Sequence, residues 1–230
     1  MGEQIPLSLS LQERASFENF HGLSRHANLA LLEDIGSGTG PHMIYLWGPE
    51  GVGKSHLLYA TCNALEGNRG RSVVLPLRRS QRKNPELLEG MEQYDLVALD
   101  DIDAVAGSAL WEESLFHLLN RLRDLGSRVV ITAQTSPSGL NLDLPDLRSR
   151  IGEGVVEHLT PLEDREKWDV LQKRSEARGM VMGDEVASFL MSRTARDFHT
   201  LFALLDQLDE QTLVAKRRLT IPFVKELLSL

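Results

Sequence analysis

Short apolar runs, separated by longer stretches with helical spacing, dominate the hydrophobic pattern of the chain. A short apolar run is typical of a strand buried on both faces of a sheet. Strands that alternate with helices favour a parallel sheet covered by helices on both sides. We therefore predict an α/β fold with strands over residues 43–47, 72–75, 96–99, 129–132 and 155–159.

Helical periodicity is clearest in the middle of the chain, where leucines recur at intervals of three and four residues. They are Leu115, Leu118, Leu119, Leu122 and Leu125, and Gly126 follows them as a C-terminal stop. We also predict a helix over residues 54–65, after the first strand, and another over 85–91, before the third strand.

Beyond Thr160 the pattern changes to helices alone. The segment 160–163, Thr-Pro-Leu-Glu, has the form of a capping box with proline at the first helical position, and it predicts a helix that runs to about Arg178. Further helices are expected over residues 184–192, 197–215 and 220–228. We therefore expect three parts: a tail over residues 1–12, an α/β domain over 13–159 and a small all-helical domain over 160–230.

The loop after the first predicted strand carries the most specific motif in the chain, Gly-Pro-Glu-Gly-Val-Gly-Lys-Ser over residues 48–55. This is G-x-x-x-x-G-K-[ST] between a strand and a helix, the context that a phosphate-binding loop requires. Its glycines let successive N–H groups turn toward phosphate oxygens, and the helix N-terminus adds positive potential. We expect Lys54 to reach the β- and γ-phosphates of a nucleoside di- or triphosphate, and Ser55 to hold Mg²⁺. The residues assigned to the nucleotide here are Gly48, Gly51, Val52, Gly53, Lys54, Ser55 and His56.

Two acidic residues, Asp100 and Asp101, end the third predicted strand. Ligands of such sheets bind beyond the carboxyl ends of the strands, so both side chains should approach the phosphate loop. We assign Asp100 to Mg²⁺ together with Ser55, and Asp101 to the orientation or deprotonation of an attacking water. The alternative is an acidic loop that simply follows a buried strand.

Composition and charge limit the classes of partner and the cellular location that we expect. The chain has 230 residues and a net charge of −8, which opposes generic binding to the DNA backbone. We interpret two basic clusters, over residues 78–83 and 216–218, as solvated surface. The single cysteine, Cys62, is expected to pack in the core. No secretory signal and no apolar run long enough for a membrane span is evident, and a cytoplasmic protein is expected.

Two features stay ambiguous from the residues alone. The segment 4–9, Gln-Ile-Pro-Leu-Ser-Leu, suits an edge strand or a peptide offered to the groove of another protein. Phosphoryl transfer needs positive charge near the γ-phosphate, and Arg148, Arg150 and Arg196 are candidates. For the first two, surface pairing with Glu153 or Glu157 is the alternative.

The combination of motifs resembles the AAA+ module of the DnaA family of bacterial initiators. The resemblance lies in Phe-Glu-Asn-Phe at 17–20, Lys-Ser-His-Leu-Leu at 54–58 and the Asp100-Asp101 pair. The tail and several later stretches are similar to the Hda family of DnaA-related regulators. The tail stretch is residues 4–9, and the later stretches are residues 110–112, 142–147, 205–209 and 219–226. The resemblance implies a P-loop AAA+ core with a C-terminal helical lid, and we expect no DnaA-type DNA-binding domain after Leu230.

The resemblance also implies roles for the ambiguous residues. Arg150 matches the arginine finger that AAA+ proteins insert into a neighbour's active site, and Arg196 matches the lid arginine called sensor 2. Gln134 stands at the sensor-1 position, where DnaA-like proteins often have aspartate, so we expect the chain's own ATP hydrolysis to be weak or absent. The tail residues implied in clamp binding are Gln4, Ile5, Leu7 and Leu9.

The resulting hypothesis is a regulator of replication initiation that binds ADP or ATP with Mg²⁺. Its partners would be DnaA and the sliding clamp of DNA polymerase III, with DNA contacted only through the clamp; a homodimer is left open. An alternative from another class is a self-contained AAA+ ATPase that loads or remodels a partner protein. A P-loop kinase for small molecules is disfavoured by the expected helical lid with Arg196 and by the clamp-like tail, and the sequence indicates no pocket for an acceptor substrate.

Overall fold

The computed structural model describes residues 15–18, 20, 29–80, 84–177, 179–180, 182–193 and 220–227. By its internal contacts the chain divides into two compact units, Met1–Thr160 and Pro161–Leu230. Each unit has a hydrophobic core of its own. The predicted tail over residues 1–12 and the predicted helix over 197–215 lie outside the described residues.

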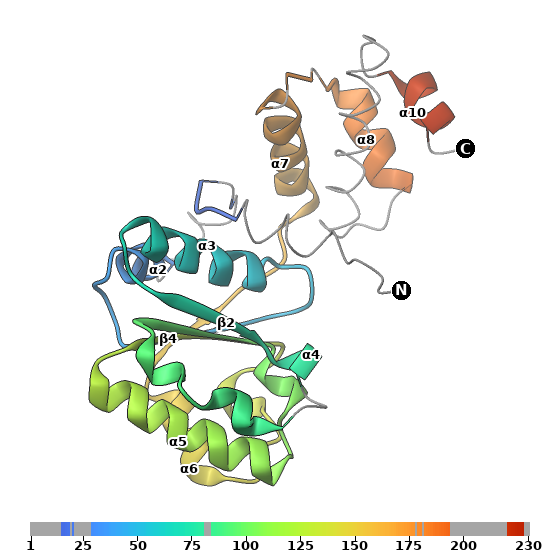
Figure 1. Ribbon diagram of the computed structural model, residues 1–230. Helices are drawn as coiled ribbons and strands as arrows, with labels where there is room; N and C mark the ends of the chain where they lie inside the picture. The colour runs from blue at the N-terminus through green and yellow to red at the C-terminus, as the bar shows by residue number, and fades with distance from the viewer. Residues whose placement is uncertain are drawn as a thin grey trace, which may run out of the picture. The chain divides into compact units, whose positions relative to one another are not determined.

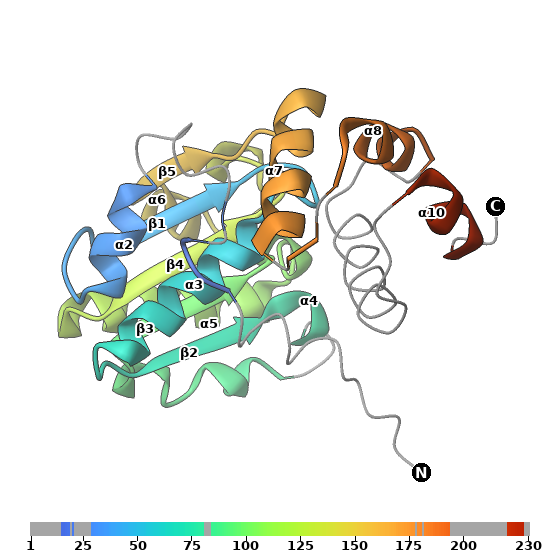
Figure 2. The same cartoon turned by 90° about the horizontal axis from the view of Figure 1, so that it is seen from above.

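The first unit is built on a sheet of five parallel strands in the order β2-β3-β4-β1-β5. Figure 2 shows the strands side by side in this order. Their bounds are β1 Met43–Trp47, β2 Ser72–Pro76, β3 Leu96–Asp100, β4 Arg128–Ala133 and β5 Val155–His158. The predicted parallel α/β sheet is therefore confirmed, strand by strand.

Helices cover both faces of this sheet, as Figure 1 shows: α2 and α3 lie on one face, and α5 and α6 lie on the other. Alternate residues of each strand enter different cores, because strand side chains point to opposite faces. In β1, Tyr45 packs on the side of α5, and Ile44 and Leu46 pack on the side of α3. Cys62, on α3, is buried in that second core, as predicted. The bounds of these helices are α2 Ala30–Gly36, α3 Lys54–Gly67, α5 Ala109–Leu125 and α6 Pro145–Gly152.

The long helix α5 confirms the prediction made from the leucine spacing. Leu115, Leu118, Leu119 and Leu122 are buried against the sheet, whereas Leu125 is 64% exposed. Gly126 ends the helix in the left-handed conformation, with φ of 76°.

Two predictions about local elements in this unit were wrong or incomplete. The helix expected over residues 85–91 is a pair of short 3-10 turns, η2 Pro85–Leu88 and η3 Met91–Gln93, because Gly90 adopts φ of 75° between them. The chain also forms α4 Leu77–Ser80 and α6, which the hydrophobic pattern did not indicate. The remaining 3-10 turns are η4 Ile102–Ala104 and η5 Pro137–Gly139.

The described part of the second unit contains α7 Asp164–Ala177, α8 Asp184–Arg193 and α10 Ile221–Leu227. Their core includes Leu171, Leu190 and Val224. Helix α7 begins at Asp164, later than the capping-box pattern at Thr160 predicted. Glu163 directly precedes it, and the backbone N–H of Glu163 donates to the side chain of Glu166 in the first turn at 2.7 Å. The helical character of this unit was predicted correctly.

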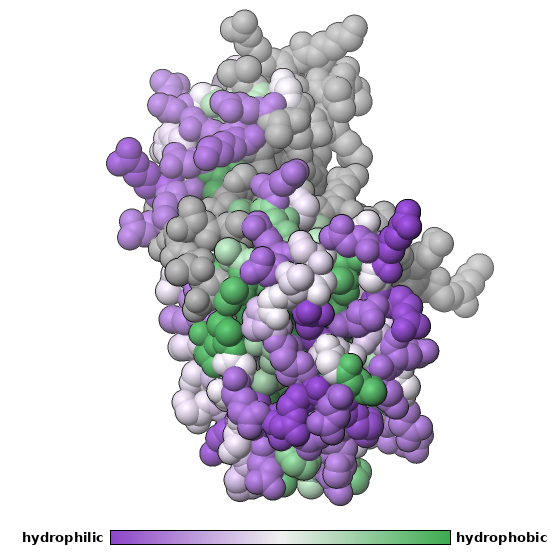
Figure 3. Space-filling model, turned by 90° about the vertical axis from the view of Figure 1, so that its left-hand side faces the viewer, coloured by the Kyte–Doolittle hydropathy of each residue, from purple (hydrophilic) through white to green (hydrophobic). Residues whose placement is uncertain are grey.

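The surface carries no broad apolar face among the described residues. Figure 3 shows a face on which hydrophilic side chains predominate and hydrophobic ones form small groups. Large hydrophobic side chains that are exposed are few and lie apart in the sequence: Leu87, Leu110, Leu125 and Val156. None of the helices in the described ranges combines the length and apolar character that crossing a membrane requires.

Candidate nucleotide-binding site

The phosphate loop follows β1 and leads into α3, and its backbone shape depends on glycine at both ends. Gly48 has φ of 154°, and a Cβ added there would lie 2.2 Å from the backbone oxygen of Leu159. Gly53 has φ of 95° just before the first residue of α3, and a Cβ there would lie 2.6 Å from the ring of Phe20. Backbone conformation and the lack of space both disfavour any larger residue at these two positions. The loop leads directly into the N-terminus of α3, and a helix N-terminus is a favourable place for a phosphate.

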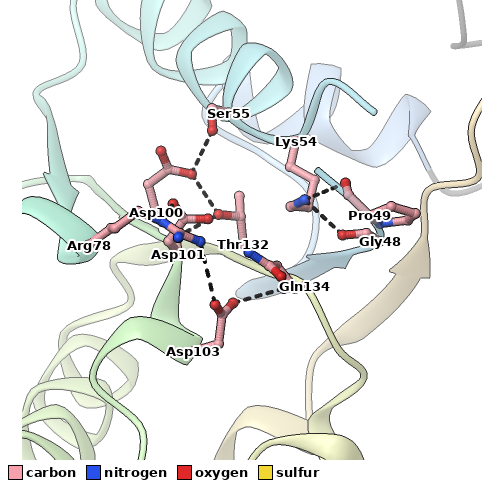
Figure 4. Close-up of polar contacts among 10 residues, drawn as sticks. All are labelled: Gly48, Pro49, Lys54, Ser55, Arg78, Asp100, Asp101, Asp103, Thr132 and Gln134. Atoms are coloured by element: carbon pink, nitrogen blue, oxygen red, sulfur yellow. Dashed lines mark hydrogen bonds and ion pairs between the residues drawn. The ribbon is translucent and has the colours of Figure 1, made fainter. Parts of the chain in front are cut away.

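Lys54 extends across this loop. Its Nζ donates to the carbonyl oxygens of Gly48 and Pro49, both at 2.8 Å, as Figure 4 shows. Burial lowers the pKa of the ammonium group, and the charges of Asp101 and Asp103 oppose that shift. A buried cation whose hydrogen bonds go to two neutral carbonyl groups can also accept an anionic ligand, because a phosphate oxygen forms a charge-assisted hydrogen bond with an ammonium group.

Ser55 and Asp100 meet at the carboxyl edge of the sheet, as predicted from their positions in the sequence. The Ser55 hydroxyl donates to Oδ1 of Asp100 at 2.9 Å, and the Thr132 hydroxyl donates to the same oxygen at 2.6 Å. Burial, and next the charge of Asp101, raise the pKa of Asp100, whereas the two hydrogen bonds lower it. One carboxylate and one hydroxyl beside a phosphate loop fit Mg²⁺, which completes its shell with phosphate oxygens and water.

Asp101 lies beside this pair but has a partner of its own. Arg78 of α4 donates through Nε to Oδ2 of Asp101 at 2.9 Å. Asp101 has φ of 60°, and its backbone N–H donates to the Thr132 hydroxyl at 2.9 Å. For Arg78 the interpretation as solvated surface agrees with its exposure, and its guanidinium also pairs with Asp101.

A third carboxylate, Asp103, extends the network toward Gln134. Its Oδ1 accepts the backbone N–H of Gln134 at 2.8 Å, and its Oδ2 lies 3.8 Å from Nη2 of Arg78 (Figure 4). Sequence reasoning did not assign Asp103, Thr132 or Arg78 to the site. The available signal was the polar Thr132 directly after the apolar run 129–131 of β4, the strand beside β3.

His56 and Val52, two residues assigned to the nucleotide, make contacts within the protein. His56 Nε2 lies 2.9 Å from the carbonyl oxygen of Ser16, and its ring centroid is 5.9 Å from that of Phe20. Val52 packs against the core on the α3 side of the sheet. Both residues therefore tie the phosphate loop and α3 to the rest of the unit.

Arg150 lies elsewhere, on α6. Its guanidinium pairs with Glu153, its Nε is buried with no hydrogen-bond partner among the described residues, and its side chain is 15% exposed. Burial is the largest cause that lowers the pKa of His42, which directly precedes β1, and the charges of Arg123, Arg128 and Arg150 follow in that order. Arg150 is thus near the amino end of β1, whereas the phosphate loop follows the carboxyl end.

The register of the sheet supports this placement of Arg150. Strand β5 begins at Val155, three residues after α6 ends, and Val155 is paired with Ile44 near the start of β1. A five-residue strand spans about 16 Å, so a full strand length separates this end of α6 from the chain's own phosphate loop. The other predicted site residues, Gln4, Ile5, Leu7, Leu9 and Arg196, lie outside the described part of the chain.

Comparisons with known proteins agree with this geometry. Residues 11–158 match the family model of the bacterial DnaA ATPase domain, and residues 164–228 match that of the Hda lid domain. An uncharacterized protein of Haemophilus influenzae is 42% identical over 234 residues, which cover both chains completely.

Solved structures with a similar fold include two DnaA proteins and a branch migration motor. Domain III of the Thermotoga maritima replication initiation protein DnaA has a TM-score of 0.75 at 21% identity, covering 94% of this chain and 95% of that one. AMPPCP-bound DnaA from Aquifex aeolicus has a TM-score of 0.67 at 19% identity, covering 85% and 62%. The Thermotoga maritima RuvB Holliday junction branch migration motor has a TM-score of 0.69 at 16% identity, covering 95% and 72%. At these identities the structures show the fold.

Proposed function

The chain belongs to the bacterial DnaA ATPase family and carries an Hda-type lid, and from that premise we propose that it regulates replication initiation by stimulating hydrolysis of DnaA-bound ATP. The expected Hda-like, DnaA-related AAA+ architecture is confirmed by these family matches and by the similarity to DnaA domain III. The catalytic cation in this proposal is Arg150, which acts on the nucleotide of a neighbouring DnaA.

The position of Arg150 is the observation that carries the proposal. Helix α6, which carries Arg150, leads to the start of β5 at the amino edge of the sheet, whereas the chain's own phosphate loop follows the carboxyl end of β1. This separation favours a role for Arg150 away from the chain's own nucleotide. A cation that is remote from its own phosphate site but mounted on a short helix at the edge of the domain can act on a second molecule. Its pairing with Glu153 would be exchanged for a phosphate when the neighbour binds.

In this proposal the chain's own nucleotide has a structural role. We assign ADP or ATP, by analogy with the AMPPCP-bound DnaA of Aquifex aeolicus, to the loop that Lys54 crosses. Ser55 and Asp100 would hold Mg²⁺ through their oxygens. The Asp101 carboxylate is already bound to Arg78, which supports weak hydrolysis at this site, since a water would compete with that ion pair.

The tail supplies the second half of the proposal. Gln4, Ile5, Leu7 and Leu9 would bind the sliding clamp and so tether the regulator to DNA that carries a loaded clamp. Tethering raises the local concentration of the regulator near DnaA without direct contacts to DNA. This fits the net charge of −8. The setting is the cytoplasm, and a homodimer is one form in which the free regulator would be stored.

The experiment is hydrolysis by ATP-loaded DnaA with this protein, sliding clamp and DNA added singly and together. We expect full stimulation of hydrolysis only when all components are present. Changing both Gln4 and Leu7 to alanine should abolish this stimulation, because the tail would no longer bind the clamp. Substantial ATP turnover by this chain alone, indifferent to clamp and DnaA, would support the rival ATPase. The observation that favours that rival is the assembled Ser55–Asp100 pair beside the phosphate loop.

A further inference from the structure

The helix that carries Arg150 is fixed at its start by a buried carboxylate from another helix. Glu112 of α5 is 1% exposed. Its Oε1 accepts the backbone N–H of Gly107 at 2.7 Å, and its Oε2 accepts the backbone N–H of Leu144 at 2.7 Å. Leu144 is the residue directly before α6, so one carboxylate joins the entry of this helix to a second loop.

That second loop comes from the nucleotide site. Gly107 ends the segment that follows Asp100 and Asp101 and contains η4. The same segment holds Asp103, which accepts the N–H of Gln134 beside the phosphate-binding edge. Through Glu112, therefore, the entry of α6 is held at a fixed distance from the loop behind the acidic pair.

Arg148 makes a second tie at the same place. Its Nη2 donates to the carbonyl oxygen of Leu142 at 2.7 Å and, more weakly, to that of Leu140 at 3.4 Å. The guanidinium thus holds the loop that leads into its own helix. Residues two apart on a helix do not share a face, so Arg148 and Arg150 point in different directions.

We infer that Glu112 and Arg148 are positioning residues for Arg150, which anchor α6 through loop backbone so that the guanidinium of Arg150 is presented in one place. The inference rests on the proposed role of Arg150 as the cation that acts on DnaA. It gives Arg148 a role distinct from a second arginine finger, because its Nη2 donates to the carbonyl oxygens of Leu142 and Leu140 in the loop before its own helix. It also gives the buried Glu112 a function beyond packing.

The first test follows backbone amide exchange. Glu112→Gln keeps the shape of the side chain but leaves one of the two N–H groups facing an amide NH₂ rather than an oxygen. We expect faster exchange at Gly107, at Leu144 and through residues 145–152, with the sheet unchanged. The matched control is Glu113→Gln on the same helix, where the side chain is 71% exposed. Exchange in Glu112→Gln that equals the control would overturn the inference.

The second test measures the stimulated rate. A displacement of a catalytic group by about 1 Å can reduce a rate by about 100-fold. Glu112→Gln and Arg148→Met should therefore each lower the maximal stimulated hydrolysis rate by roughly 10- to 100-fold. Nucleotide affinity should stay intact in both variants. A purely structural role of either side chain would lower nucleotide affinity and the stimulated rate together. A parallel loss of both would therefore overturn the inference.

These outcomes separate the inference from the proposed function. If the wild-type protein fails to stimulate DnaA, the proposed function fails, yet amide exchange still decides whether Glu112 anchors α6. If Glu112→Gln does not fold, the same amide-exchange measurement is made on Arg148→Met. Its control is Arg123→Met, which changes an exposed arginine on α5. Wild-type exchange through residues 145–152 in Arg148→Met would then refute the anchoring role.

Discussion

At the scale of single residues, the site places Lys54 and Asp100 at the same edge of the sheet without joining them directly. Lys54 is held by the carbonyl oxygens of Gly48 and Pro49, and Asp100 by the hydroxyls of Ser55 and Thr132. Burial acts on both, lowering the pKa of the lysine and raising that of the aspartate. A nucleotide with Mg²⁺ would bring further opposite charge to both groups at once, phosphate to Lys54 and the cation to Asp100.

The raised pKa of Asp100 predicts how Mg²⁺ binding depends on pH. The carboxyl group binds the cation only when it is ionised. The folded pKa of Asp100 lies above the ordinary value of 3.8. Mg²⁺-dependent nucleotide affinity should therefore be complete above this pKa and should be lost as pH falls through it. Thr132→Val removes a hydrogen bond that lowers this pKa, and the loss should then begin at higher pH. Calorimetric titration with Mg²⁺-ADP at a series of pH values measures both midpoints. Identical midpoints in the two proteins would contradict the assignment, and titrations with EDTA are the control.

The pKa of His42 tests the position of Arg150 independently of function. Burial comes first among the causes that lower this pKa from 6.5, followed by Arg123, Arg128 and Arg150. Arg150→Met should raise the pKa, as measured by NMR titration of the imidazole, whereas Arg148→Met should not. Because the folded pKa lies below 6.5, His42 reduces the free energy of unfolding only as pH falls from 6.5 through the folded pKa. A pKa that does not respond to Arg150→Met would place the arginine elsewhere.

At the scale of elements, Gly53 joins the phosphate loop to α3, and we expect it to determine both the backbone conformation there and the binding of nucleotide. Gly53→Ala puts a methyl group 2.6 Å from the ring of Phe20 at φ of 95°, which costs at least about 1–2 kcal/mol of stability from the backbone alone. We expect a lower urea midpoint and loss of binding of a fluorescent ADP analogue.

Gly67→Ala is the matched control at the other end of the same helix. A Cβ at Gly67 meets nothing within 4 Å, so this change should be neutral or stabilise the protein by up to about 1 kcal/mol. Full nucleotide binding by Gly53→Ala, or equal unfolding midpoints for the two variants, would show that the loop geometry is not what fixes the site.

The elements also show which parts of the structure could be predicted from sequence. Strands such as β1 and β3 were predictable because both faces are buried, which leaves a continuous apolar run. Helix α6 was missed because its eight residues bury only Leu147 and Ile151, too few to show a periodic face. The helix expected at 85–91 failed at Gly90, whose left-handed conformation carries no hydrophobic signal.

The candidate site divides in the same way. A local motif indicated Lys54 and Ser55, and the position of Asp100 at a strand end indicated that it would join them. The bond between Arg78 and Asp101 joins residues 23 apart through the adjacency of β2 and β3, which no local pattern encodes. The roles of Gln4 and Arg196 remain predictions, since both lie outside the described residues.

At the scale of the whole molecule, a bound nucleotide should stabilise the folded chain. A ligand present at 100 times its dissociation constant adds about 2.7 kcal/mol to the free energy of unfolding. ADP with Mg²⁺ should therefore raise the melting temperature of the wild-type protein, and Lys54→Ala should abolish that shift, because Lys54 is the cation that crosses the phosphate loop. Lys225→Ala in α10 is the control, and an ADP-induced shift that survives in Lys54→Ala would remove the phosphate loop from the account.

The central claim is that this protein supplies Arg150 to the ATP of DnaA, and one comparison tests it most directly. ATP preloaded on DnaA is followed through a single turnover with clamp-loaded DNA and either the wild-type protein, Arg150→Ala or the exposed control Arg123→Ala. An arginine finger in trans accelerates hydrolysis by about 10³- to 10⁵-fold in comparable systems, so Arg150→Ala should return the rate to that of DnaA alone while nucleotide and clamp binding persist. Arg123→Ala should stimulate like the wild type. Stimulation by Arg150→Ala equal to that of the wild-type protein would contradict the account.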